Sequence, residues 1–160
     1  MTLLLFLLLF LALHVFLFFL SLKKVFHSHN KITFIYPWGF IFGAFVWEDL
    51  LVFSLFHALL ALVVLVLSDI RLGLLGICVF WMIRSSGETL YFFLQQFINK
   101  KVYPHKITKK LAYFKRLLGG ISDQKAFIIL QVFHQTIVVV FTIFLIMLIK
   151  NWSEIPSWIW

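Results

Sequence analysis

Four long apolar runs constrain what this chain can fold into. The first, TLLLFLLLFLALHVFLFFLSL (residues 2–22), is followed by runs at 47–67, 72–97 and 127–149. An α-helix rises about 1.5 Å per residue, so about 20 apolar residues cross the roughly 30 Å hydrocarbon core of a bilayer. Each run therefore predicts a transmembrane helix. The fold class that we expect is an all-α integral membrane protein, with four transmembrane helices forming a bundle in a single domain, residues 1–160.

The composition favours lipid as the main solvent of this chain. A soluble domain carries about 25% charged residues, whereas this chain of 160 residues has 12% charged and 63% hydrophobic residues. The hydrophobic residues are mainly Leu and Phe in continuous runs, which a polar outer face cannot hide. The class of water-soluble globular proteins is therefore excluded. A lone cysteine, Cys78, also excludes an intrachain disulfide and a cysteine-based zinc site.

Two parts of the N-terminal half need a separate explanation. Residues 2–22 lack the basic start, the short apolar stretch and the small-residue cleavage site of a secretory signal, so we expect a retained helix. The apolar stretch around the second run is longer than one upright helix requires, and Pro37 and Gly39 predict a break within it. We therefore expect residues 32–46 to form an interfacial segment ahead of the second span.

The positive charges predict the orientation of the chain. Eleven of the fourteen Lys and Arg residues lie in two segments, 23–31 and 100–125. With four spans, the first and third connections lie on the same side of the membrane. The positive-inside rule places both connections, 23–31 and 100–126, in the cytoplasm. Both termini of this multi-pass protein are then expected on the non-cytoplasmic side.

The third run contains charged residues where lipid would least tolerate them. On a helix, Arg84, Glu88, Tyr91 and Gln95 share one stripe. A charge at the centre of a spanning helix costs about 2.5–3.5 kcal/mol on insertion scales, so the stripe is expected to face protein. Arg84 and Glu88 are four residues apart and can also neutralise each other as an intramembrane salt bridge.

The fourth run offers a polar face that can meet this stripe. If Gln95 meets Gln131, one antiparallel alignment also brings Tyr91 to Gln135 beside His134. The same alignment brings Glu88 to Val138 and Arg84 to Thr142. We call this predicted interface the polar seam, and its members are Arg84, Glu88, Tyr91, Gln95, Gln131, His134, Gln135 and Thr142.

The connection between the third and fourth runs contains an amphipathic basic helix, HKITKKLAYFKRLLGG (residues 105–120). Such a helix lies in the membrane interface and binds anionic headgroups, with each base adding roughly 1 kcal/mol near the surface. A docking site for a cytoplasmic partner would use the same residues, but the aromatic spacing matches no RNA-binding module, so lipid is expected and nucleic acid is not. The basic residues of this surface are Lys106, Lys109, Lys110, Lys115 and Arg116.

Three classes of function fit these residues. The most economical is a non-catalytic accessory or scaffold subunit, in a homo-oligomer or a larger membrane complex, that uses the polar seam for assembly. A second is a small oligomeric transporter or channel in which Glu88 and His134 handle protons or cations. A third is an intramembrane enzyme or a bis-His haem carrier, although His57 and His134 lie at different depths in their runs. The residues have no metal-ligand spacing, so we predict no metal and no cofactor.

Overall fold

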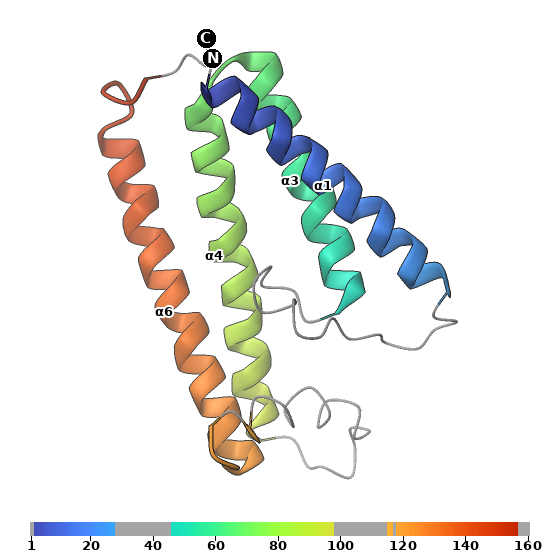
Figure 1. The fold of residues 1–160 in the computed structure, drawn as a ribbon. Helices are drawn as coiled ribbons and strands as arrows, with labels where there is room; N and C mark the ends of the chain where they lie inside the picture. The colour runs from blue at the N-terminus through green and yellow to red at the C-terminus, as the bar shows by residue number, and fades with distance from the viewer. Residues whose placement is uncertain (1, 28–45, 98–114, 117, 157–160) are drawn as a thin grey trace. The chain divides into compact units, whose positions relative to one another are not determined.

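Four long helices make up most of the chain that the structure describes (Figure 1). The structure is a computed structural model, and it describes residues 2–27, 46–97, 115–116 and 118–156. Its helices are α1 (Thr2–His27), α3 (Trp47–Leu67), α4 (Ile70–Gln95) and α6 (Asp123–Lys150). Each is long and apolar enough to cross a membrane, which confirms an all-helical chain with four candidate spans. The predicted interfacial segment, apart from Val46, lies outside the described residues.

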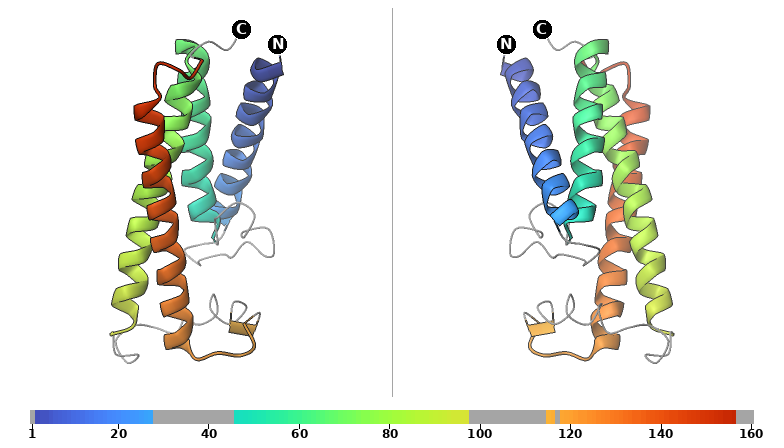
Figure 2. Two further views of the ribbon diagram at one scale, coloured as in Figure 1. Left: turned by 90° about the vertical axis from the view of Figure 1, so that its left-hand side faces the viewer. Right: turned by 90° about the vertical axis from the view of Figure 1, so that its right-hand side faces the viewer.

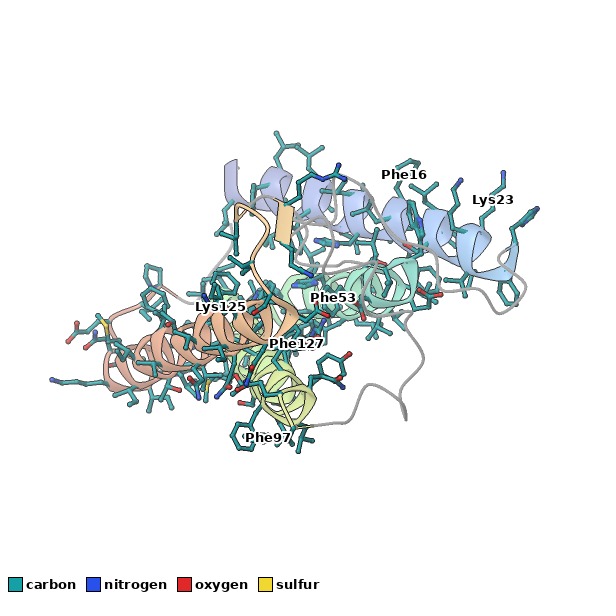
Figure 3. All side chains as sticks on the ribbon, turned by 90° about the horizontal axis from the view of Figure 1, so that it is seen from below. Phe16, Lys23, Phe53, Phe97, Lys125 and Phe127 are labelled. Carbon is teal, nitrogen blue, oxygen red and sulfur yellow. The ribbon has the colours of Figure 1, made fainter. Side chains whose placement is uncertain are left out.

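Polar residues extend α1 beyond its predicted end. α3 has the predicted bounds, whereas α1 continues through Lys23 and Lys24 to His27. A lysine can occupy this place because its stem lies along apolar surface while its charged head reaches water. In Figure 3 the side chain of Lys23 projects away from the end of α1.

α6 begins before the predicted start at residue 127 because its first turn is capped. The Ser122 hydroxyl accepts a hydrogen bond from the backbone N–H of Lys125 at 3.4 Å, and Asp123 places negative charge at the helix N-terminus. Gly119 and Gly120 precede the cap with φ angles of +77° and +80°, a conformation that glycine adopts at little cost. A search for apolar residues alone misses this polar first turn.

The described residues fall into two compact units, residues 1–74 with 153–160 and residues 75–152. In the first unit α1 and α3 lie side by side, as Figure 2 shows from two directions. Leu7 packs on Val64 at one end of the pair, and the rings of His14 and His57 stack farther along. Because residue numbers rise along α1 as they fall along α3, the two helices are antiparallel.

Small residues allow α1 and α3 to approach each other closely. Ala61 of α3 is only 2% exposed, and both Ser54 of α3 and Ser21 of α1 are fully buried. The hydroxyls of Ser21 and Ser54 donate to the carbonyl oxygens of Leu17 and Leu50 on their own helices, each at 2.7 Å. Since these polar groups are satisfied within their own helices, the contact needs no polar partner across the interface.

A two-residue connection, Ser68 and Asp69, joins α3 to α4. Ser68 has the left-handed φ of 53° that reverses the chain. Arg71 Nη2 donates to Asp69 Oδ2 at 2.7 Å, and its side-chain hydrogen bonds hold the pKa of Asp69 below its ordinary value. One turn farther on, a Cβ added at Gly73 would lie 2.9 Å from Cγ2 of Val64. The start of α4 therefore lies against the end of α3.

In the second unit α4 and α6 run antiparallel with aromatic rings between them. The ring of Phe92 lies 5.6 Å from that of His134 and 6.3 Å from that of Phe127, and Trp81 stacks on Phe141 at 6.1 Å. Figure 3 shows Phe127 where α6 meets α4. Aromatic rings therefore make contact between α4 and α6 at two levels of the pair.

Large apolar side chains project from the outside of all four helices. Phe16 is 63% exposed, Ile83 is 69% exposed and Ile146 is 60% exposed, and in Figure 3 Phe16 points away from α3. Monomeric soluble proteins rarely expose continuous apolar surface of this extent. Lipid contact explains it, in agreement with the hydropathy of the four helices.

Candidate functional site

The charged residues of α4 pair with each other within the helix. Arg84 Nη1 donates to Glu88 Oε1, and the two side chains are only 22% and 20% exposed. The spacing of four residues places both on one side of the helix. The ion pair leaves little net charge in the candidate span, although each charge still has a local field.

Glutamines join α4 to α6 at the end where α4 terminates. Gln96 Nε2 donates to Gln131 Oε1 at 2.5 Å and to the backbone oxygen of Phe92 at 3.3 Å. The predicted alignment had placed Gln95 opposite Gln131, one residue before the observed donor. Gln95 itself is half-buried. The residue that meets Gln131 is therefore Gln96, one position after the predicted Gln95, so α4 is rotated by about one residue relative to the prediction.

Aromatic packing explains this rotation of α4. Phe92 is 9% exposed, whereas Tyr91, which was predicted to face α6, is 37% exposed. A phenylalanine ring in contact with His134 and Phe127 gains more from packing than a tyrosine whose hydroxyl needs a partner. The stripe that faces α6 is therefore centred on Trp81 and Phe92 rather than on polar residues alone.

His134 lies at the centre of the α4–α6 interface. It is 9% exposed and its ring stacks on Phe92. Its Nδ1 atom is buried and makes no hydrogen bond to any described residue. The structure thus places His134 against α4, the helix that carries the Arg84–Glu88 pair.

Two other predicted members of the polar seam lie elsewhere on α6. Gln135 is exposed, on the outside of the helix. The Thr142 hydroxyl donates to the carbonyl oxygen of Val138 at 2.7 Å, four residues back on the same helix. Thr142 is therefore satisfied locally and Gln135 is directed away from α4.

Two buried hydroxyl groups of α4 were not among the predicted site residues. Ser85 is fully buried, and neither its Oγ nor the Oγ1 of Thr89 has a hydrogen-bond partner among the described residues. Ser85 lies seven residues before Phe92, so both occupy the same face of α4. That spacing could have identified Ser85 once Phe92 was known to face α6.

A second cluster in the first unit joins two histidines that the sequence analysis treated separately. The rings of His14 and His57 stack with centroids 4.8 Å apart and planes at 18°, and Phe10 contacts both edge-on. His57 Nδ1 lies 2.7 Å from the carbonyl oxygen of Phe53. If this nitrogen donates to the carbonyl, the tautomer places the lone pair of His57 on Nε2.

The ring geometry of His14 and His57 differs from that of axial haem ligands. A histidine nitrogen lies about 2 Å from its metal, so ligands on opposite faces of one iron hold their nitrogens about 4 Å apart with the rings farther out. Parallel rings with centroids at 4.8 Å stack on each other instead. His57 and His134, the pair considered for haem, lie in different units. Within the described ranges, no three His, Cys, Asp or Glu residues form a group suited to a metal.

Only two residues of the predicted basic surface can be placed. Lys115 Nζ pairs with Asp123 Oδ1 at 2.5 Å, and Arg116 is exposed. Lys106, Lys109 and Lys110 lie outside the described residues. Lys115 thus contributes to the cap region of α6 as well as to the positive charge of this connection.

No protein-family model, no curated protein and no solved structure matches this chain. The class of protein is therefore inferred from the sequence and the structure of this chain. Four helices long and apolar enough to span a membrane indicate a multi-pass helical membrane protein.

Proposed function

We propose that this chain is a non-catalytic subunit of a membrane assembly, in which the α4–α6 pair acts as a scaffold that presents a polar contact to a partner helix. The observation that carries the proposal is the exposure of Gln135. It is the thirteenth residue of the 28-residue α6, near the middle of the helix. Its amide therefore lies at a depth where lipid offers no hydrogen bond.

The neighbouring residue shows why Gln135 needs a partner. Thr136 is also exposed, but its hydroxyl donates to the carbonyl oxygen of Val132 at 2.9 Å on the same helix. A glutamine amide has two donor hydrogens and an acceptor oxygen, more than one backbone carbonyl can satisfy. Leaving such a group in hydrocarbon costs roughly 2–7 kcal/mol, depending on the reference state. A polar side chain of a partner helix would remove this cost.

The ion pair supports a structural role for the interior of the α4–α6 pair. Arg84 and Glu88 neutralise each other, and Gln96 binds Gln131 across the interface. The ion pair neutralises charge within α4 and the glutamine bond joins α4 to α6, and neither requires a substrate. The exposed amide is then the feature left for assembly.

Two leucine substitutions on α6 test the proposal with the same chemical change. Gln135→Leu should release the partner and leave the thermal stability of the subunit nearly unchanged, because Gln135 lies outside the α4–α6 interface. Gln131→Leu should keep the partner and lower the thermal stability, because it removes the bond to Gln96. Light scattering in a mild detergent, with mass spectrometry of co-purifying proteins, measures the assembly against the monomer mass of 18.9 kDa.

Two results would reject the scaffold. One is a wild-type protein that is monomeric both in detergent and after cross-linking in its native membrane. The other is an assembly that Gln135→Leu leaves intact. The measured mass also distinguishes a second copy of this chain from a different partner protein.

Transport is the second candidate because His134 is buried against Phe92 of α4, the helix that carries Glu88, and its Nδ1 has no partner among the described residues. Such intramembrane groups commonly mark ion or proton pathways. A proton or cation leak in liposomes that is lost in Glu88→Gln would favour transport over the scaffold. Absence of flux, together with loss of the assembly in Gln135→Leu, would favour the scaffold.

A further inference from the structure

A stripe of exposed side chains runs along α6 with Gln135 near its middle. Its other members are Ile128, Val132, Val139 and Ile146, which are between 43% and 60% exposed. Their spacings of three, four and seven residues place all five on one side of the helix. We call this surface the glutamine stripe. Gln135 is its one polar member, so the stripe is an apolar surface interrupted by a single amide.

The apolar members of the glutamine stripe are all β-branched. Valine and isoleucine already keep to one preferred χ1 rotamer in a helix, so they lose little side-chain freedom when another helix packs on them. Phe133 and Phe144, on a different side of α6, are similarly exposed but are not β-branched. Heptad-spaced β-branched residues interrupted by one polar residue are typical of a contact between two helices, in which the polar residue fixes the register.

The depth of Gln135 restricts what can satisfy its amide. It is the thirteenth of the 28 residues of α6, so the group that meets it must lie near the middle of another spanning helix. The positive-inside rule predicts one orientation for every copy of the chain. A second copy therefore presents its own Gln135 at this depth, within the same stripe.

The amide of a glutamine is complementary to that of a second glutamine. It has two donor hydrogens and an acceptor oxygen, so each of two amides can donate to the other. A twofold axis brings the same surface of two identical chains together, and two copies of one orientation place this axis along the membrane normal. No member of the glutamine stripe is charged, so like charges do not oppose the approach of a second copy along it.

We propose that the partner of α6 is a second copy of this chain, which packs its glutamine stripe on the same stripe so that the two Gln135 amides bond to each other. This inference rests on the proposed scaffold function and specifies the partner. In the resulting parallel dimer Phe133 and Phe144 face lipid. The α4–α6 contact is kept within each copy, because Phe127 and His134, whose rings contact Phe92, are not part of the stripe.

Disulfide cross-linking tests the pairing, because two cysteines join only when their Cα atoms lie within about 7 Å of each other. In a Cys78→Ala background, Val132→Cys and Val139→Cys should each cross-link to the same residue of a second copy when native membranes are oxidised. Phe133→Cys and Phe144→Cys are the matched controls, since both positions are similarly exposed on α6 but lie off the stripe. The stripe cysteines should give at least about tenfold more product of twice the 18.9 kDa monomer mass than the controls.

Substitution of Gln135 tests the bond between the two amides. In the Val139→Cys variant, Gln135→Leu should reduce the cross-linked product to the level of the controls, whereas Gln135→Asn, which keeps an amide, should retain more of it. Equal product from stripe and control cysteines would overturn the stripe as the contact between copies. Unchanged product in Gln135→Leu would overturn the amide bond.

Two further outcomes distinguish this inference from the scaffold function on which it rests. An assembly that contains a different protein and is lost in Gln135→Leu, without a cross-link at Val132→Cys or Val139→Cys, would overturn the second copy and leave the scaffold in place. A chain that is monomeric in its native membrane would reject both. Using two stripe cysteines and two controls keeps the test decisive if one variant does not fold.

Discussion

The two helix pairs of this protein satisfy their polar groups in different ways. In the α1–α3 pair, the hydroxyls of Ser21 and Ser54 bond to carbonyl oxygens of their own helices. In the α4–α6 pair the Thr142 hydroxyl also bonds to its own helix, but Gln96 in addition donates to Gln131 across the interface. Backbone-satisfied serines allow small residues to bring two helices close together, whereas side-chain bonds require room and specify which residues meet. Among the described residues, the first pair therefore packs through small side chains and stacked rings, whereas the second adds a hydrogen bond between side chains of its two helices.

The largest effect that we expect tests the ion pair within α4. Glu88→Ala should lower the free energy of unfolding by about 2 kcal/mol, less than the roughly 3–5 kcal/mol for breaking a fully buried pair because both partners are about one-fifth exposed. The double variant Arg84→Ala/Glu88→Ala should lose less, because it strands no charge. Denaturant unfolding in detergent micelles measures both. A double variant less stable than Glu88→Ala alone would mean that the ion pair is not what stabilises α4.

A smaller effect should test how closely α1 and α3 pack at Ala61. Ala61→Leu adds volume where α1 and α3 are closely packed, and should lower the free energy of unfolding by about 1–2 kcal/mol. Ala12→Leu makes the same change at an exposed position of α1 and should cost less. The same unfolding measurement compares the two. Equal costs would mean that close packing at Ala61 does not stabilise the α1–α3 pair.

The smallest effect concerns the ion pair at the connection of the first unit. Because hydrogen bonds from Arg71 hold the pKa of Asp69 below its ordinary value, ionised Asp69 stabilises the fold above that ordinary value. The contribution is lost as the pH falls through the lowered pKa. Asp69→Asn should therefore unfold at a slightly lower temperature than the wild type at neutral pH, and at the same temperature in strong acid. A difference that persists in acid would assign the effect to packing instead of charge.

The candidate spans were predictable because hydrocarbon allows few alternatives. A run such as residues 47–67 has no charged residue beyond Glu48 and Asp49 in its first turn, and the structure forms α3 with those bounds. The ends of α1 and α6 were less predictable. They depend on Lys23 and Lys24 reaching water and on the Ser122 cap, neither of which contributes to the apolar signal.

The contacts of individual side chains were harder to predict than the helices. The polarity of α4 predicted that Tyr91 and Gln95 face α6. In the structure Phe92 packs on His134 and Gln96 bonds to Gln131, so these residues face α6 instead. The His14–His57 stack depends on which helix lies beside α1, and a single sequence contains no signal for that pairing. Periodicity identifies the face of a helix only when the residues on that face are clearly unlike their neighbours.

The short connection between α3 and α4 has a consequence for how the protein is made. Ser68 and Asp69 are the whole of it, and the left-handed Ser68 already reverses the chain. Because only two residues separate the helices, α3 and α4 leave the ribosome as one continuous hairpin, and the helix ends beside Asp69 and Arg71 stay next to each other.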